Sequence, residues 1–258
     1  MYNKILLLSG IGWSSKLIAN YLVSKGYEVT VIKEEKIPIR LLLKNRILRI
    51  GFFKVIDQVL FQVIIVSLLK VFSRHRINQI MKRFPVTNIC FDQSIKIFNV
   101  QSINHPKVSE LLKRLDYNLI VVNGTRIISP EIIKSTDKKI INTHCGITPE
   151  FRGSHGAYWA MHCGKSELAG VTIHIVEEGI DTGKILWQSQ IDPQKGDCFL
   201  TYGYLQYLSA LKGFDFVIGD LMDCREISPS LVTNESFSRL WSTPGITDYI
   251  RGIVRKVY

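Results

Sequence analysis

The chain opens with a strand-helix-strand pattern, and this order constrains its fold more than any other feature. Residues 4–9 (KILLLS) are a continuous apolar run typical of a buried strand, and a turn with Gly10 and Gly12 follows. A helical segment then reaches about Lys25, and residues 27–33 (YEVTVIK) have the β-branched alternation of a second strand. Two strands joined through a helix pair in parallel. The sequence therefore predicts an α/β sheet.

Later segments extend this pattern and then change it. Further buried strands are expected at residues 118–122 and 139–142, whereas runs 171–177 and 184–191, separated by EGIDTG, predict an antiparallel hairpin. Residues 39–84 are helical in pattern and interrupt the alternation. We predict a three-layer, Rossmann-like, mostly parallel α/β sheet with a helical insertion and a C-terminal antiparallel hairpin. Other helices are expected at residues 108–115, from Pro130 and at about 199–218, and the tail shows no clear period until residues 246–254.

Size and composition predict one main domain. A chain of 258 residues with 46% hydrophobic residues can bury one large core. We expect this domain over residues 1–220, and a tail without a domain of its own over 221–258. The five cysteines are scattered and never form a C-x-x-C pair, and the first strand begins without a signal-peptide pattern. A cytoplasmic location is expected.

The insertion carries most of the charge. Residues 39–84 contain ten Lys or Arg and one acid, Asp57, which is a net charge of +9 out of +11 for the chain. Such a field attracts nucleic acid, an anionic membrane or a phosphorylated substrate. The longest stretch without a charge covers residues 58–69, shorter than the roughly 20 residues that span a bilayer, so we do not expect a transmembrane helix.

The apolar part of the insertion needs a partner. The run VLFQVIIVSLL is apolar on all sides. Three partners remain open: the protein's own core, a second copy in a homodimer, or the interface of an anionic membrane at its inner surface.

Polar side chains gather where the strand at 139–142 ends. Asn142 and His144 are two residues apart on an extended segment, so they point to the same side. Asp181 lies at the tip of the predicted hairpin, between Gly179 and Gly183. An amide, an imidazole and a carboxylate together suit acyl transfer, because they can stabilise an oxyanion and move a proton.

Three stretches, LIVVNGTRIISPEII, INTHCGITPEFRG and GVTIHIVEEGIDTGKIL, resemble the catalytic core of the 10-formyltetrahydrofolate-dependent formyltransferases. That family includes glycinamide ribonucleotide transformylase, methionyl-tRNA formyltransferase and sugar N-formyltransferases. The resemblance implies that Asn142, His144 and Asp181 are catalytic. It also implies a folate pocket lined by Gly124, Thr125, Arg126, Ile127, Ile128, Val176, Glu177, Glu178 and Gly179. After His144, Cys145 and Gly146 replace the family's usual Pro-Ser pair.

The resemblance also implies the partners. It implies 10-formyltetrahydrofolate as formyl donor, no metal, no nucleic acid, and a small amine acceptor that is phosphorylated or nucleotide-linked. Free backbone N–H groups at Gly10, Gly12 and Ser14, where a helix begins, favour an anion. Arg152 and His155 are further candidates for acceptor binding; a solvated arginine and a turn-stabilising histidine are the alternatives.

The leading hypothesis is an enzyme that formylates an amino sugar or a nucleotide-linked amino sugar. The alternatives are a glycinamide ribonucleotide-type transformylase, a hydrolase that releases formate from the same folate, and a non-catalytic folate-binding protein.

Overall fold

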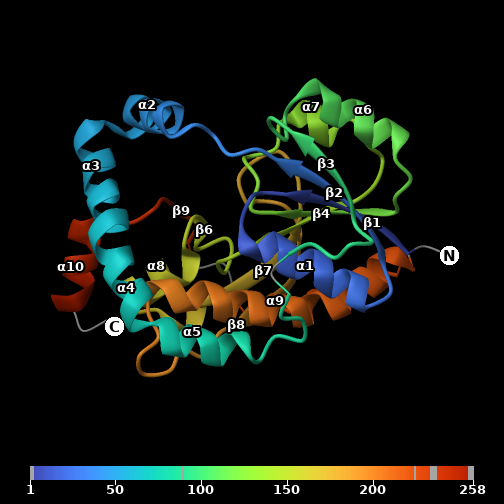
Figure 1. Cartoon of the computed structure of the whole chain (residues 1–258). Helices are drawn as coiled ribbons and strands as arrows, with labels where there is room; N and C mark the ends of the chain where they lie inside the picture. Colours follow the sequence, from blue (N-terminus) through green and yellow to red (C-terminus); the bar gives the residue numbers. More distant parts are fainter. Residues whose placement is uncertain (1–2, 89, 224, 233–236, 255–258) are drawn as a thin grey trace.

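The computed structural model describes residues 3–88, 90–223, 225–232 and 237–254. Its centre is a seven-stranded sheet in the order β3-β2-β1-β4-β5-β7-β8 (Figure 1). The strands of this sheet are β1 (Lys4–Ser9), β2 (Glu28–Glu34), β3 (Lys96–Val100), β4 (Leu119–Asn123), β5 (Ile140–His144), β7 (Gly170–Ile175) and β8 (Ile185–Gln190).

The strand directions match the sequence prediction. Strands β1 to β5 pair in parallel, while β7 runs antiparallel to both β5 and β8. The strand β3 was missed by the prediction, because its edge position leaves four of its five residues at least partly exposed and removes the apolar signal.

Helices cover both faces of the sheet and give the predicted three layers (Figure 1). One face packs Ile5 and Leu7 against α1 and α9, and the other packs Leu6 and Leu8 against α6 and α7. The helices are α1 (Trp13–Ser24), α2 (Ile39–Ile50), α3 (Phe52–Leu60), α4 (Val66–Phe72), α5 (Arg74–Met81), α6 (Pro106–Arg114), α7 (Pro130–Ile133), α8 (Gly156–His162), α9 (Phe199–Met222) and α10 (Ile246–Val254). Two short turns are the π-helical η1 (Phe61–Ile65) and the 3₁₀-helical η2 (Ser166–Leu168).

The insertion is helical, as predicted, and consists of three helical segments: α2, the helix Phe52–Phe72 and α5. Gly51, with φ of 84°, separates α2 from one continuous helix, Phe52–Phe72, formed by α3, η1 and α4. The inner side of this helix is buried, and Phe61 is fully enclosed. Only 22% of the most apolar 18-residue stretch of the helix is buried, however. The interpretation that the segment packs in the protein's own core is therefore wrong for its outer side, because that side faces away from the sheet.

The length argument against a spanning helix is also corrected. It was based on the stretch without charge, whereas the helix Phe52–Phe72 has 21 residues and is long and apolar enough to cross a membrane by length and composition alone.

The tail packs back onto the domain. A short strand, β9 (Leu240–Trp241), pairs in parallel with β6 (Arg152–Gly153), and α10 packs against α3. Residues 246–254, where a periodic pattern returns, form the helix α10. The tail thus lies beside the loop that follows β5.

Candidate active site

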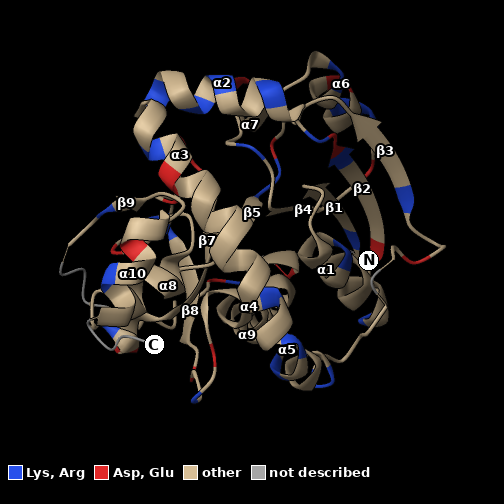
Figure 2. Cartoon of the chain, turned by 60° about the vertical axis from the view of Figure 1, so that its left-hand side comes forward, with Lys and Arg blue, Asp and Glu red and all other residues tan. Residues whose placement is uncertain are grey.

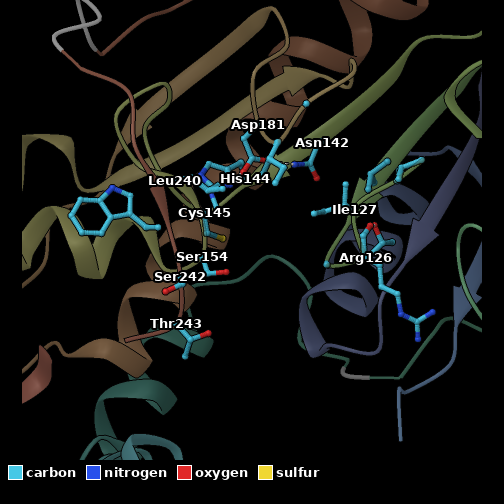
Figure 3. A pocket seen from close by; sticks show the side chains of 18 of the residues that line it. Arg126, Ile127, Asn142, His144, Cys145, Ser154, Asp181, Leu240, Ser242 and Thr243 are labelled. Atoms are coloured by element: carbon cyan, nitrogen blue, oxygen red, sulfur yellow. Dashed lines mark hydrogen bonds and ion pairs between the residues drawn. The ribbon is translucent and has the colours of Figure 1, made fainter. Parts of the chain in front are cut away.

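The predicted catalytic residues meet in one cavity at the carboxyl end of β5. Asn142 and His144 extend from β5, and the loop between β7 and β8 returns Asp181 to the same place (Figure 3). The cavity has a volume of about 960 Å³, and all three residues line it. Its position follows the rule that ligands bind beyond the carboxyl ends of strands in open α/β sheets.

The imidazole of His144 lies between two oxygen acceptors. Its Nε2 lies 2.7 Å from the backbone oxygen of Phe151, and its Nδ1 lies 3.2 Å from Oδ2 of Asp181. When Nε2 donates to Phe151, Nδ1 of the neutral ring has a free lone pair. Burial lowers the pKa of His144, while Asp181 and the Phe151 carbonyl oppose this shift. The neutral ring is therefore poised to accept a proton at Nδ1, where a carboxylate would stabilise it.

The carboxylate of Asp181 is held from several sides. It accepts the backbone N–H of Gly153 at 2.9 Å and lies 3.5 Å from Nε2 of His174. Burial raises its pKa, but His144, His174 and the Gly153 N–H together outweigh burial and bring the pKa to about 2. Its backbone has φ of 51°, which is uncommon for a residue other than glycine and indicates local strain. Asp181 is thus an ionised acceptor in a fixed position.

Asn142 is held by a second histidine. Its Nδ2 donates to Nε2 of His174 at 3.2 Å and to Oδ1 of Asp181 at 3.4 Å, and Nδ1 of His174 donates to the Ile175 carbonyl. The amide oxygen of Asn142 points away from Asp181 (Figure 3). Because Nδ2 is engaged, Asn142 must rotate before it can donate to a bound carbonyl oxygen.

Gly146 makes room for the His144 contact. A Cβ atom at Gly146 would lie 2.3 Å from the Phe151 oxygen and 2.6 Å from Nε2 of His144. Any side chain at this position would therefore separate the imidazole from Phe151. The neighbouring Cys145 also lines the cavity, and burial raises its pKa to about 12, so the thiol stays protonated at neutral pH.

The residues predicted to bind folate line the same cavity, with one exception. The loop residues Gly124, Thr125, Arg126, Ile127 and Ile128 all line the cavity, as do Val176, Glu177 and Gly179. The cavity lining does not include Glu178, whose carboxylate lies at the surface and pairs with Lys134 at 2.8 Å.

Arg126 anchors the loop. Its side chain contacts Glu34 at 3.2 Å and donates to the backbone oxygens of Gln101 and Glu35, and its backbone N–H also donates to Glu34. The guanidinium therefore extends away from Asn142, His144 and Asp181 (Figure 3). Gly124 has φ of 66°, which favours glycine at this turn.

The insertion and the tail also contribute to the cavity lining. The tail supplies Leu240, Trp241, Ser242 and Thr243, while α2 supplies Leu42, Asn45, Arg46, Arg49 and Ile50. Arg46 donates to Oε1 of Gln58 at 2.6 Å, and burial together with the nearby Arg49 lowers its pKa. Two guanidinium groups beside one cavity form a positive site for an anion.

The other substrate-binding candidates lie outside the cavity lining. Gly10 packs against Gly124, and the Ser14 hydroxyl is buried and accepts from Asn123.

Arg152 donates to the Ile180 carbonyl and thereby braces the hairpin loop. The exposed His155 packs its ring 4.7 Å from that of Phe199. The lining likewise omits Gly12.

Sequence reasoning missed three contributors to the cavity, of which His174 is the most informative. The sequence around His174 indicates only a strand residue, but His174 pairs directly with Asn142 in the β5–β7 register. Because cross-strand partners lie side by side, this register is the signal that would have found it. The insertion and tail residues carry no comparable signal.

Comparisons with known proteins agree with this site. The family model described as formyl transferase matches residues 52–199, more than half of the chain. Methionyl-tRNA formyltransferase of Caldanaerobacter subterraneus is 30% identical over 115 residues, covering 44% of this chain and 37% of that protein. The chain therefore spans about a third of the length of that curated relative.

Two solved structures share the fold. Phosphoribosylglycinamide formyltransferase of Streptococcus pneumoniae has a TM-score of 0.54 at 19% identity, covering 86% of this chain and 99% of its own. A sugar N-formyltransferase of a Shewanella species has a TM-score of 0.50 at 17% identity, and the match covers 96% of this chain and 86% of that protein.

The mostly parallel sheet, with an Asn, a His and an Asp gathered in a cavity at the end of β5, defines an α/β protein with a polar site at the carboxyl edge of its sheet. The chain belongs to the formyl transferase family. Among the described residues, no group of three or more His, Cys, Asp or Glu side chains could hold a metal ion.

Proposed function

We propose that this chain transfers a formyl group from 10-formyltetrahydrofolate to the amine of an amino sugar that carries a phosphate or nucleotide group. The observation that carries the proposal is one cavity lined both by Asn142, His144 and Asp181 and by Arg46 and Arg49. The first three residues suit formyl transfer, and the two arginines suit an anionic acceptor. A cytoplasmic location is part of the proposal and rests on the scattered cysteines.

The cavity fits a folate donor. Its volume of about 960 Å³ lies within the usual range for small-molecule sites. Val122, Ile128 and Val176 give it an apolar wall, and the loop from Gly124 to Ile127 offers backbone polar groups beside that wall. When bound, the donor supplies an activated formyl group attached to nitrogen.

The chain's own residues handle the charge and the proton. As the acceptor amine attacks, Asn142 rotates and donates an Nδ2 hydrogen to the formyl oxygen, which becomes an oxyanion. His144 accepts the amine proton at Nδ1, and the ionised Asp181 stabilises the resulting imidazolium. The imidazole then returns the proton to the departing nitrogen.

The acceptor test compares two arginines of the same helix. Arg49 lines the cavity, whereas Arg40 is exposed and does not. Transfer is measured with phosphorylated, nucleotide-linked and neutral amino sugars and with glycinamide ribonucleotide. We expect Arg49→Gln to raise KM for the anionic amino sugars about tenfold, the loss of one charge-assisted contact, while Arg40→Gln leaves it unchanged.

Each other outcome contradicts a stated part of the proposal. If glycinamide ribonucleotide is formylated in preference to the amino sugars, it is the acceptor and the amino-sugar assignment is wrong. Formate release that needs no amine would indicate a hydrolase, and donor binding without turnover would indicate a folate-binding protein.

A further inference from the structure

The outer side of the helix Phe52–Phe72 is an exposed apolar stripe. Its large hydrophobic residues are between 38% and 86% exposed, with Phe53 at 86% and Phe72 at 80%. They recur every three or four residues, so they form one face of the helix. The stripe consists of Phe52, Phe53, Ile56, Val59, Leu60, Val63, Ile64, Leu68, Val71 and Phe72. We define these ten residues as the outer face.

The opposite side of the helix fixes its orientation. Phe61 is buried against Phe199 and Tyr249, and the buried Gln58 donates to the backbone oxygen of Thr243. Asp57 accepts from the backbone and hydroxyl of Thr247. The helix cannot rotate its outer face inward without breaking these contacts. A stripe of this size on a soluble monomer marks an interaction surface.

The charges around the outer face identify the partner. Bases lie on α2 at one end and near α4 and α5 at the other (Figure 2). The exposed ones include Arg40 and Lys44 on α2, Lys70 on α4 and Arg74 on α5. The single acid of residues 39–84, Asp57, is turned inward and its side chain is 15% exposed. An apolar strip between bases, without an exposed acid in this segment, matches the surface of a bilayer that contains anionic phospholipid.

Two other arrangements fit less well. A second copy docked through the same face would bring the basic ends of both copies together, and like charges repel. A helix that crossed the bilayer would have to give up the contacts of Gln58 and Asp57 with the tail, which would leave polar groups in hydrocarbon.

We propose that the outer face docks this protein on an anionic membrane surface, with the helix Phe52–Phe72 lying parallel to the bilayer plane. Apolar side chains enter the region between headgroups and acyl chains, and the bases at both ends contact the anionic headgroups. α10, which packs on α3, also carries the exposed Ile250 and Ile253. The proposal does not depend on the identity of the acceptor amine.

Vesicle co-sedimentation of the full chain tests this proposal. The protein is mixed with vesicles of phosphatidylcholine alone or of phosphatidylcholine and phosphatidylglycerol, at low and high salt. We expect binding to the mixed vesicles at low salt, and release at high salt because salt screens the headgroup attraction. Absence of binding to the mixed vesicles at low salt would overturn the proposal.

Paired variants locate the contact. Phe53→Ser should weaken binding about tenfold, the loss of one buried aromatic side chain, whereas Phe216→Ser, at an exposed phenylalanine of α9, should not. Replacing Lys70 or Arg74 by Gln should weaken binding to the mixed vesicles about fivefold each. The same change at Lys113 or Arg114 of α6 should leave vesicle binding unchanged. Equal losses in variants and controls would overturn the assignment of the surface.

Two further readouts separate the alternatives. All the substituted side chains are exposed, so thermal unfolding should be nearly unchanged and should exclude misfolding as the cause. A dimer in light scattering that Phe53→Ser dissociates, without vesicle binding, would establish self-association and overturn the membrane proposal. Protein that alkaline carbonate cannot extract from membranes would indicate a spanning helix and would also overturn it.

Discussion

Nδ1 of His144 lies 3.2 Å from Oδ2 of Asp181, and the two side chains are only 5% and 12% exposed. The carboxylate is ionised, with a pKa of about 2, and the imidazole has its other nitrogen engaged with Phe151. The pair therefore holds an acceptor site for one proton inside the protein, beside the cavity where an amine would lose one.

The first prediction concerns the pKa of His144. Asp181 raises this pKa against the dominant effect of burial, so Asp181→Asn should lower it further below its ordinary value of 6.5. An NMR titration of the His144 ring in both proteins measures the change. An unchanged or higher pKa in the variant would show that the carboxylate does not stabilise the imidazolium.

The second prediction concerns Gly146. A methyl group there would lie within 2.6 Å of Nε2 of His144, so Gly146→Ala should displace the imidazole and lower kcat by about tenfold or more. Gly203 in α9 is the matched control, because its Cβ position is open. Gly203→Ala should keep kcat and raise stability by about 1 kcal/mol, as expected for Ala in a helix. Wild-type kcat in Gly146→Ala would mean that the His144–Phe151 contact has no part in catalysis.

The third prediction concerns Arg126, which we expect to act on folate binding through the loop rather than by contact. Arg126→Gln removes the ion pair with Glu34 and loosens the loop from Gly124 to Ile128, so a folate analogue should bind about tenfold more weakly by calorimetry. Arg114→Gln, on the exposed side of α6, is the control and should bind normally. Equal affinities in the two variants would place the folate pocket elsewhere.

The fourth prediction concerns stability in acid. The pKa of Asp181 is depressed from 3.8 to about 2, so its charge contributes stability above pH 3.8, and this contribution is lost as the pH falls towards 2. The difference in unfolding free energy between wild type and Asp181→Asn should shrink by about 2 kcal/mol from about pH 5 to about pH 2. Urea unfolding measures it, with Asp192→Asn as the exposed control. If the difference in unfolding free energy does not vary with pH, the pKa of Asp181 is not depressed in the folded protein.

The sheet and the meeting of Asn142, His144 and Asp181 in one cavity were predictable because their signals are local. The apolar runs of β1, β4 and β5 identify the sheet, and the two-residue spacing of Asn142 and His144 places both in one crevice. The hairpin to Asp181 follows from the turn residues around it.

The remainder of the site depends on contacts between distant segments. His174 enters the site through the register of β7 against β5, which no local pattern fixes. Arg46 and Arg49 line the cavity because of where α2 packs. The helix Phe52–Phe72 has one apolar side exposed, although its sequence pattern equally suits a helix buried in the core. Such contacts are decided by tertiary packing.

The most direct test follows a labelled formyl group from 10-formyltetrahydrofolate in wild type and in Asn142→Ala, His144→Ala, Asp181→Ala and the triple variant. Our account predicts that wild type moves the label to the amine of an anionic amino sugar. Each single variant should lose about 100-fold or more in rate, and the triple variant little beyond the worst single one, because the residues act as a unit. Label that stays on the folate or appears only as formate in wild type, or a variant that transfers at the wild-type rate, would contradict it.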